Sequence, residues 1–375
     1  MIEKFKVNIP QSELDDLNDR IKKVRWPDEI KNSDWKYGTS LSYIKELADY
    51  WLEEFDWRII EKEINSFPNF IADVDGNQIH FLHIKSNKKN AIPIIITHGW
   101  PGSFLEMLKI IPYLTESEES PFDLVIPSII GFGFSKKPTE NGSDYGFNAE
   151  LWHKLMLKLG YNKYGVQGGD IGAGISIKIA QKYPENIIGL HLNYISDSYK
   201  PYSEENENID THIVKFQKAT QMWNEREGAY ASLHSTKPLS LAYGLNDSPI
   251  GLCGWIIEKF NAWSDNNGDI ENSFTKQELL ANVTLYWLTQ TIHSSIRMYH
   301  EISNSPLKFG KDDFVKTPVG FAKFPKEIPT PPRDYIEKGF NVVHWTEMPK
   351  GGHFPALEQP KLLADDIIRF FEKLK

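Results

Sequence analysis

The sequence predicts an α/β fold, in which a mostly parallel, doubly wound sheet carries an inserted helical lid and is preceded by a helical extension. Two observations predict the sheet. Short, continuous apolar runs at 92–97 and 123–127 are typical of strands buried on both faces. Strand-like and helix-like segments also alternate from there on. The third observation predicts the lid, because this alternation stops near residue 196 and resumes near residue 317.

The first ninety residues are predicted to be mainly helical. Apolar residues recur on one helical face in the first segment: Leu14, Leu17 and Ile21. A second amphipathic stretch covers residues 42–64. Strands at 69–74 and 78–84 then flank Asp75-Gly76, a dipeptide that favours the tight turn of a hairpin. We therefore assign residues 1–90 to an N-terminal region that includes the start of the sheet.

Strands and helices alternate through the first part of the core, which we assign to residues 91–195. After the strand at 92–97, the predicted segments are helix 104–114, strand 123–127, helix 151–159, strand 164–167, helix 171–183 and strand 187–193. This order implies right-handed crossovers between parallel strands.

The predicted lid covers residues 196–315. Trp, Tyr and Leu recur there at helical spacing, as in residues 279–298, without strand-like runs between them. The alternation then resumes with two strands and a final helix: 317–324, 340–348 and 362–374. Residues 316–375 are therefore assigned to the last part of the core.

Composition excludes several classes of function. The chain has 375 residues, with 42 Lys+Arg against 51 Asp+Glu and a formal net charge of −9. Without a long basic block it lacks the electrostatic footprint that nucleic acids or anionic lipids require. Cys253 is the only cysteine, which excludes an internal disulfide and cysteine-clustered metal sites and favours a reducing compartment.

Targeting and cofactor signals are not visible in the sequence. Apolar runs fall far short of the ~20 residues that span a bilayer, and the N-terminus does not read as a signal peptide. We therefore expect a cytoplasmic protein without a membrane anchor. The histidines show no H-E-x-x-H spacing, so we expect neither a metal nor an organic cofactor. The sequence leaves the oligomeric state open, a homodimer included.

A turn rich in glycine and proline follows the first apolar strand. The segment HGWPGS at 98–103 can aim backbone N–H groups at one point, as an oxyanion hole requires. The alternative interpretation is an ordinary turn.

The segment GGDIG at 168–172 follows the strand at 164–167. Small residues two before and two after a central nucleophile permit the sharp bend of a nucleophile elbow. The central residue here is Asp170, and no G-x-S-x-G occurs in the chain, so a serine esterase has no nucleophile. Taken alone, Asp170 is better explained as the N-cap of the following helix than as a nucleophile.

A histidine and a carboxylate follow the last two strands. His353 lies in GGHFP at 351–355, and imidazole suits proton abstraction near neutral pH. Glu327 ends the segment FPKE and could orient the imidazole, although Asp334 and Glu337 in the same loop compete with it. The order Asp170, Glu327, His353 is the chain order of the α/β-hydrolase triad.

These segments resemble an epoxide hydrolase of the microsomal type over nearly the whole chain. The similar N-terminal segments are FKV at 5–7, RWP at 25–27 and DWR at 56–58. The core segments HGWPG, GGDIG, FPKE and GGHF resemble the motifs of that family. The lid segments that resemble it are EGAY at 227–230, LNDSP at 245–249 and SSIRMY at 294–299.

The resemblance implies a function and a role for each site residue. Asp170 would attack a small lipophilic epoxide to give a covalent ester, and Tyr230 and Tyr299 would activate the epoxide oxygen. Water activated by His353 with Glu327 would then release a vicinal diol. The resemblance further implies an oxyanion hole made by the backbone N–H groups of two residues: Trp100 and Ile171.

The sequence also departs from the family. Ile171 replaces a tryptophan often found after the nucleophile, which changes the pocket wall, and the membrane anchor of microsomal members is not seen. The nearest alternative function is a haloalkane dehalogenase, which uses the same Asp nucleophile but holds halide with indole or amide N–H groups. A non-catalytic binding protein on the same scaffold is the third alternative, for which an incomplete triad is expected.

Overall fold

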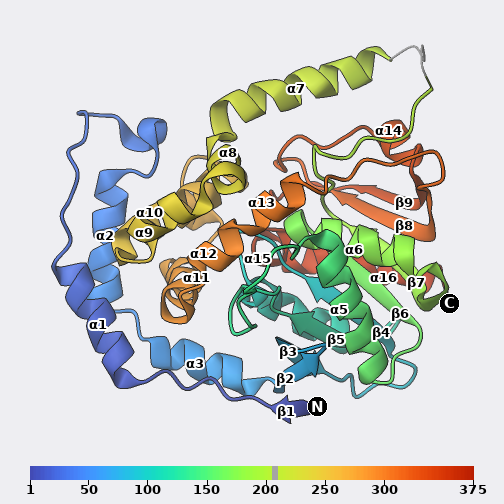
Figure 1. Cartoon of the computed structure of the whole chain (residues 1–375), viewed down its shortest axis with the longest axis horizontal. Coiled ribbons are helices and arrows are strands. Elements are labelled where there is room, and N and C mark those ends of the chain that lie inside the picture. Colours follow the sequence, from blue (N-terminus) through green and yellow to red (C-terminus); the bar gives the residue numbers. More distant parts are fainter. Residues whose placement is uncertain (205–209) are drawn as a thin grey trace.

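The computed structural model describes residues 1–204 and 210–375, and these residues build one nine-stranded sheet (Figure 1). The strand order is β1-β2-β3-β5-β4-β6-β7-β8-β9. Strands β1, β2, β3 and β5 pair antiparallel, whereas all pairs from β5 through β9 are parallel. The strands are β1 Ile2–Lys4, β2 Asn69–Val74, β3 Asn77–Ile84, β4 Ile92–Thr97, β5 Phe122–Pro127, β6 Tyr164–Gly168, β7 Ile187–Leu192, β8 Val315–Lys323 and β9 Phe340–Glu347.

The central strands are apolar because both of their faces are covered. In β4, Ile95 packs into one hydrophobic cluster while Ile94 and Ile96 pack into another. This follows from the strand geometry, in which successive side chains point to opposite faces. The first cluster includes the helices α5 (Tyr145–Lys158) and α6 (Asp170–Lys182), and the second includes α16 (Pro360–Glu372). The predicted doubly wound sheet is therefore confirmed.

One predicted core helix, at 104–114, is divided into two helical elements of different type. Residues 104–114 form a 3-10 segment, η2 (Phe104–Ile110), followed by the short helix α4 (Ile111–Thr115). Pro112 lies in the first turn of α4 and has no N–H to donate to the carbonyl of Leu108. An α-helix cannot run unbroken through this point. Three shorter core elements complete the helices: η3 Pro184–Asn186, α14 Arg333–Glu337 and α15 Pro355–Glu358.

The N-terminal region runs along the outside of the molecule (Figure 1). Its helices are α1 Gln11–Lys22, η1 Asp34–Tyr37, α2 Leu41–Glu53 and α3 Trp57–Ser66. Leu14, Leu17 and Ile21 of α1 are buried as predicted. The stretch 42–64 is two helices rather than one, because the Asp56 side chain accepts from the backbone N–H of Arg58 at 2.8 Å and starts a new helix.

The chain between β7 and β8 supplies a group of helices that we call the lid. They are α7 Thr211–Glu227, α8 Ala229–Thr236, α9 Pro238–Leu245, α10 Pro249–Trp263, η4 Ile270–Asn272, α11 Lys276–Thr289, α12 Ile292–Ile296 and α13 Met298–Ser303. In Figure 1 the lid helices α9 to α12 lie between the N-terminal helices and the sheet. Helices α10 and α11 contact α2, so the N-terminal region supports the lid from outside.

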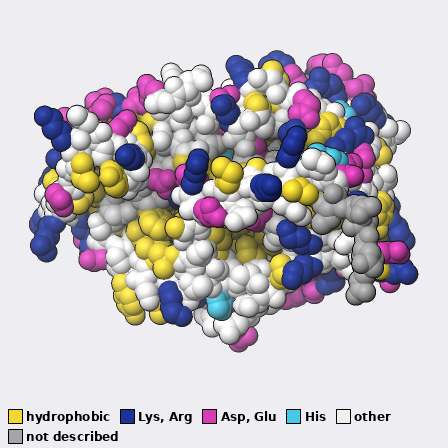
Figure 2. All heavy atoms as spheres, turned by 90° about the horizontal axis from the view of Figure 1, so that it is seen from above, with side chains coloured by type: hydrophobic (Ala, Val, Ile, Leu, Met, Phe, Trp, Pro, Cys, Tyr) yellow, Lys and Arg dark blue, Asp and Glu magenta, His cyan; other side chains and the backbone are white. Residues whose placement is uncertain are grey.

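The described part of the chain has no helix with the length and apolar character that a membrane crossing needs. On the face drawn in Figure 2, basic and acidic side chains are interspersed rather than segregated. That face therefore carries no extended field of one sign.

Candidate active site

Asp170 stands at the sharp turn between β6 and α6. Its φ angle is +48°, in the left-handed region that residues other than glycine rarely occupy. Such a conformation costs about 1–3 kcal/mol and persists only where the surroundings enforce it. This is the geometry of a nucleophile elbow, and it presents the side chain of Asp170 at the carboxyl edge of the sheet.

Glycines around the elbow permit close backbone approaches. A Cβ on Gly172 would overlap the carbonyl oxygen of Thr97 at the end of β4, and one on Gly168 would overlap Gly172. A Cβ on Gly99 would occupy the place of the Asp170 carboxylate. Glycine is therefore required here for space, which explains the spacing of small residues in both segments.

The Asp170 carboxylate is held from two sides. Its Oδ1 accepts a hydrogen bond from the backbone N–H of Trp100 at 2.8 Å, and its Oδ2 lies 3.4 Å from Nε2 of His353. The N-cap of α6 is Gly169, and no side chain caps that helix. The helix-cap interpretation of Asp170 is therefore wrong.

His353 is held by a carboxylate on its other ring nitrogen. Nδ1 of His353 lies 2.6 Å from Oε1 of Glu327, and both side chains are buried. The competing carboxylates point elsewhere: Glu337 pairs with Arg333 at 2.7 Å, and Asp334 pairs with His212 at 2.6 Å. The structure thus brings Glu327, and neither competitor, to the histidine.

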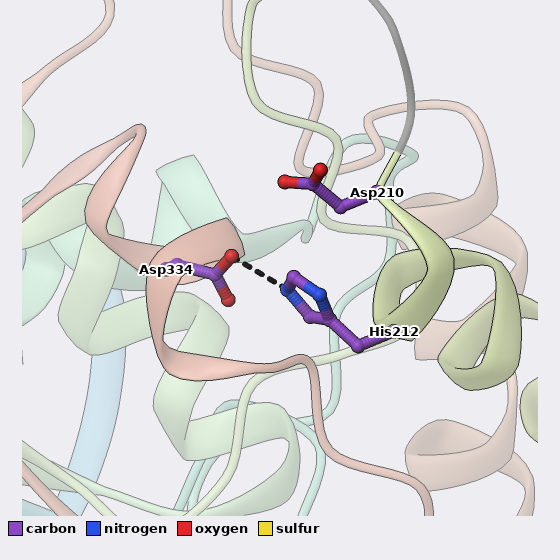
Figure 3. A group of neighbouring side chains, drawn as sticks. All are labelled: Asp210, His212 and Asp334. Carbon is purple, nitrogen blue, oxygen red and sulfur yellow. Dashed lines mark hydrogen bonds and ion pairs between the residues drawn. The ribbon is translucent and has the colours of Figure 1, made fainter.

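Figure 3 shows the surroundings of Asp334. It faces His212 from α14, with Asp210 beside them, at the start of α7. The three side chains are exposed and close enough to share an ion, but none of them lines the pocket described below. They take no part in the triad.

Two opposing effects set the protonation of His353. Burial alone would lower its pKa, but the carboxylates of Glu327 and Asp170 outweigh burial and raise the pKa well above its usual value. At neutral pH the imidazolium form is therefore stabilised between two carboxylates. This charge balance holds only while both carboxylates are ionised.

A pocket of about 510 Å³ opens in front of Asp170 and is roofed by the lid. Tyr230 of α8 and Tyr299 of α13 line it, with their ring centroids 5.8 Å apart. Burial, together with the nearby charge of Asp170, raises the pKa of both phenols, so they stay protonated at neutral pH. The pocket is therefore lined by a carboxylate at the edge of the sheet and by two phenols of the lid.

Trp100 links the two halves of this site. Its ring stacks on Tyr230 with centroids 5.5 Å apart and meets the edge of Tyr299 at 5.9 Å. His234 packs edge-on against Trp100 at 4.7 Å, and burial lowers the pKa of His234 to about 3. The residue whose N–H holds Asp170 thus also packs against both tyrosines.

The lining of the pocket is part apolar and part polar. Its aromatic and aliphatic residues include Tyr145, Ile171, Tyr194, Trp223, Tyr230 and Tyr299. Its other lining residues include a set with hydroxyl, amide or carboxylate groups: Ser196, Asp197, Ser198, Thr220, Asn224, Ser232, Ser235 and Ser303. The pocket can accommodate a ligand that has both apolar and polar groups.

A second, much smaller cavity lies on the core side of the triad. It measures about 20 Å³ and is bordered by Asp170, His353, Gln167 and Glu106. That volume suits one water molecule, and Oε1 of Gln167 is buried without a hydrogen-bond partner. Burial raises the pKa of Glu106 to about 8, so this carboxyl group is largely neutral at pH 7.

Sequence analysis missed Glu106 and His234. The only signal for Glu106 was an acidic residue inside an otherwise apolar turn directly after the HGWPGS segment. The signal for His234 was its position four residues after Tyr230, which puts both on one face of a helix. Neither signal stands out without the fold.

The fold defines an α/β hydrolase in which Asp170, His353 and Glu327 lie together, and known proteins agree with this class. Residues 2–107 match the family described as epoxide hydrolase N terminus, and residues 92–219 match the alpha/beta hydrolase fold. Epoxide hydrolase 1 of Oryctolagus cuniculus is 35% identical over 98% of this chain and 88% of its own length.

Solved structures give the same result. The epoxide hydrolase of Aspergillus niger superposes with a TM-score of 0.89 at 32% identity, covering 100% of this chain and 97% of that one. Juvenile hormone epoxide hydrolase of Bombyx mori superposes with a TM-score of 0.89 at 28% identity, covering 100% and 95%. The chain belongs to the epoxide hydrolase family, and the resemblance of its motifs is confirmed.

Replacing Gly172 by alanine tests the close approach that supports the elbow. The new Cβ would meet backbone atoms of Thr97 and His98, which cannot move away, so we expect a loss of about 3 kcal/mol in the free energy of unfolding. Urea unfolding followed by tryptophan fluorescence measures it. Gly244→Ala is the matched control, because a Cβ there meets nothing within 4 Å. Equal stability of the two variants would contradict the interpretation.

Proposed function

We propose that the chain is an epoxide hydrolase that opens a lipophilic epoxide to a vicinal diol through a covalent ester on Asp170. The observation that carries the proposal is that Asp170, from the start of α6, lines the same pocket as Tyr230 and Tyr299 of the lid. An epoxide has no carbonyl group, so its opening needs a nucleophile at carbon and a proton donor at the ring oxygen. The pocket lining contains a candidate for each role.

In the first step, Oδ2 of Asp170 attacks a ring carbon. The ring C–O bond breaks, and Tyr230 and Tyr299 stabilise the departing oxygen by donating hydrogen bonds to it. Oδ1 stays in its hydrogen bond with Trp100 and becomes the carbonyl oxygen of the ester.

In the second step, water attacks Cγ of Asp170. His353 removes a proton from this water, and the small cavity beside Asp170, His353 and Glu106 is the site that we propose for it. Negative charge develops on Oδ1, where the N–H of Trp100 already points, with the N–H of Ile171 as the second donor. Breaking the Cγ–Oδ2 bond releases the diol and restores the carboxylate with one oxygen from water.

The change of His353 from imidazolium to base follows from the first step itself. Esterification removes the negative charge of Asp170, and that charge is one of the causes that hold the pKa of His353 up. The pKa therefore falls once the ester has formed, and the imidazolium gives up its proton, which passes through the phenol hydroxyl groups to the alkoxide left by ring opening. The neutral imidazole can then accept a proton from water, and Glu327 stabilises the imidazolium that results.

Product analysis tests the proposed reaction. We expect purified protein to convert an aryl or alkyl epoxide to its diol and to release no halide from a chloroalkane of similar size. The Tyr230 and Tyr299 hydroxyl groups protonate an alkoxide, whereas a halide leaving group calls for N–H donors. Chromatography of the diol and a halide assay measure the two reactions. Halide without diol would establish the dehalogenase alternative instead.

Intact-mass spectrometry of His353→Gln tests the covalent route. Without the base the second step should stop while the first continues, so the protein should gain the mass of one epoxide on the peptide that contains Asp170. Asp170→Asn is the control and should gain none. An unmodified His353→Gln protein, under conditions where the wild type forms diol, would rule the ester out.

The pH dependence of ester hydrolysis tests the role of Glu327. Glu327 raises the pKa of His353, so in Glu327→Gln this pKa should fall. The rising limb of the hydrolysis rate should then move to lower pH, while the maximum rate falls because the imidazolium is less stabilised. Single-turnover kinetics from pH 5 to 9 measure both, with Glu337→Gln as control. An unmoved limb would contradict the role.

A further inference from the structure

The loop that carries His353 is held by its backbone at every residue from 351 to 354. The N–H of Gly351 donates to Oδ2 of Asp265 at 2.9 Å, and that of Gly352 donates to Oε2 of Glu358 at 3.0 Å. The N–H of His353 donates to the carbonyl of Trp263 at 2.9 Å. The N–H of Phe354 donates to Oε1 of Glu358 at 2.9 Å. A glycine-rich loop is thus fixed without regular secondary structure.

A single carboxylate accepts hydrogen bonds from the backbone N–H groups of both residues next to His353. Glu358, the last residue of α15, binds the N–H before His353 with one oxygen and the N–H after it with the other. Burial raises the pKa of Glu358 to about 7, and the backbone N–H groups that it accepts from oppose this rise because they favour the ionised form. The peptide planes on either side of the imidazole are therefore set by a single side chain.

The same carboxylate reaches the lid. Oε2 of Glu358 also accepts from the N–H of Asp265 at 2.8 Å, two residues after the end of α10. A Cβ on Gly352 would meet Trp263, Ser264 and Asp265 at 2.6–2.9 Å, so the lid backbone lies directly on the loop. Trp263 in turn meets the ring of His353 at 5.2 Å and that of Tyr230 at 5.1 Å.

We propose that Glu358 is a positioning residue that fixes His353 against both Glu327 and the end of the lid helix α10, and that it serves the hydrolytic step rather than the attack on the epoxide. This inference rests on the proposed function. Nucleophilic attack needs Asp170 and the two phenols, and Glu358 contacts none of them. Proton removal from water needs Nε2 of His353 at hydrogen-bonding distance from that water, which depends on the loop.

The test separates the two chemical steps in Glu358→Gln. The glutamine amide has one acceptor oxygen where the carboxylate has two. Its NH₂ group takes the place of the other oxygen and cannot accept from a backbone N–H, so the loop loses part of its support. In single-turnover experiments with excess enzyme, we expect ester formation within about 3-fold of wild type and ester hydrolysis slowed about 10- to 100-fold. The ester should accumulate in the intact-mass spectrum. The rates are expressed per reactive site, so that unfolded protein does not lower the measured values.

Two further variants complete the design. Asp265→Asn weakens only the hydrogen bond that supports Gly351, so it should slow ester hydrolysis by a smaller factor than Glu358→Gln does. Asp265→Asn takes the place of Glu358→Gln in the test if Glu358→Gln does not fold. Glu337→Gln makes the same chemical change on an exposed helix and should alter neither step. The proposal would be overturned if Glu358→Gln lowered the rates of ester formation and ester hydrolysis by equal factors, or if it lowered neither rate.

The outcomes also separate this inference from the proposed function. Failure of His353→Gln to form an ester, or of the wild type to form diol, would refute the proposed function. Ester formation in His353→Gln combined with normal hydrolysis in Glu358→Gln would refute only the positioning role. A loss of hydrolysis that Glu358→Asp, which keeps the carboxylate, partly restores would support it.

Discussion

The close packing of the elbow against the end of β4 is the constraint on which the rest of the site depends. Asp170 adopts a left-handed backbone conformation that an aspartate does not favour, and the surrounding backbone leaves it no alternative. The elbow reaches Thr97 only because Gly172 has no side chain. Because the elbow lies there, the carboxylate meets the N–H of Trp100 and the imidazole of His353 at once.

The lid contributes side chains to the site as well as covering it. It contributes both phenols, and the aromatic contacts of Trp100 and Trp263 join these phenols to the two core loops that hold the nucleophile and the histidine. Several acidic groups are buried together, which electrostatic repulsion would oppose if all were ionised. Burial keeps Glu106 largely neutral, and the histidinium of His353 lies between Asp170 and Glu327, where it offsets part of their negative charge.

Much of the core could be predicted from sequence, for physical reasons visible in single segments. A strand such as β4 is buried on both faces, so its run of isoleucines has no other stable place. The structure differs from the prediction where one residue overrides the local pattern: Pro112 divides the helical segment 104–114, and Asp56 divides the amphipathic stretch 42–64. Of the candidate site, the local pattern predicted the residue types at the strand ends but left Glu327, Asp334 and Glu337 in competition. Glu327 was chosen from the resemblance of its segment FPKE.

The sequence by itself determined the order of elements, the candidate nucleophile and base, and the family, because these depend on local spacing and on motifs along the chain. Only the tertiary structure showed that Glu327, which the resemblance had indicated, faces His353, that Asp170 does not cap its helix, and that Glu106 and Glu358 lie in the surroundings of Asp170 and His353. These are matters of direction and distance between residues far apart in sequence. They follow from how the lid and the loops pack on the sheet, which no local pattern encodes.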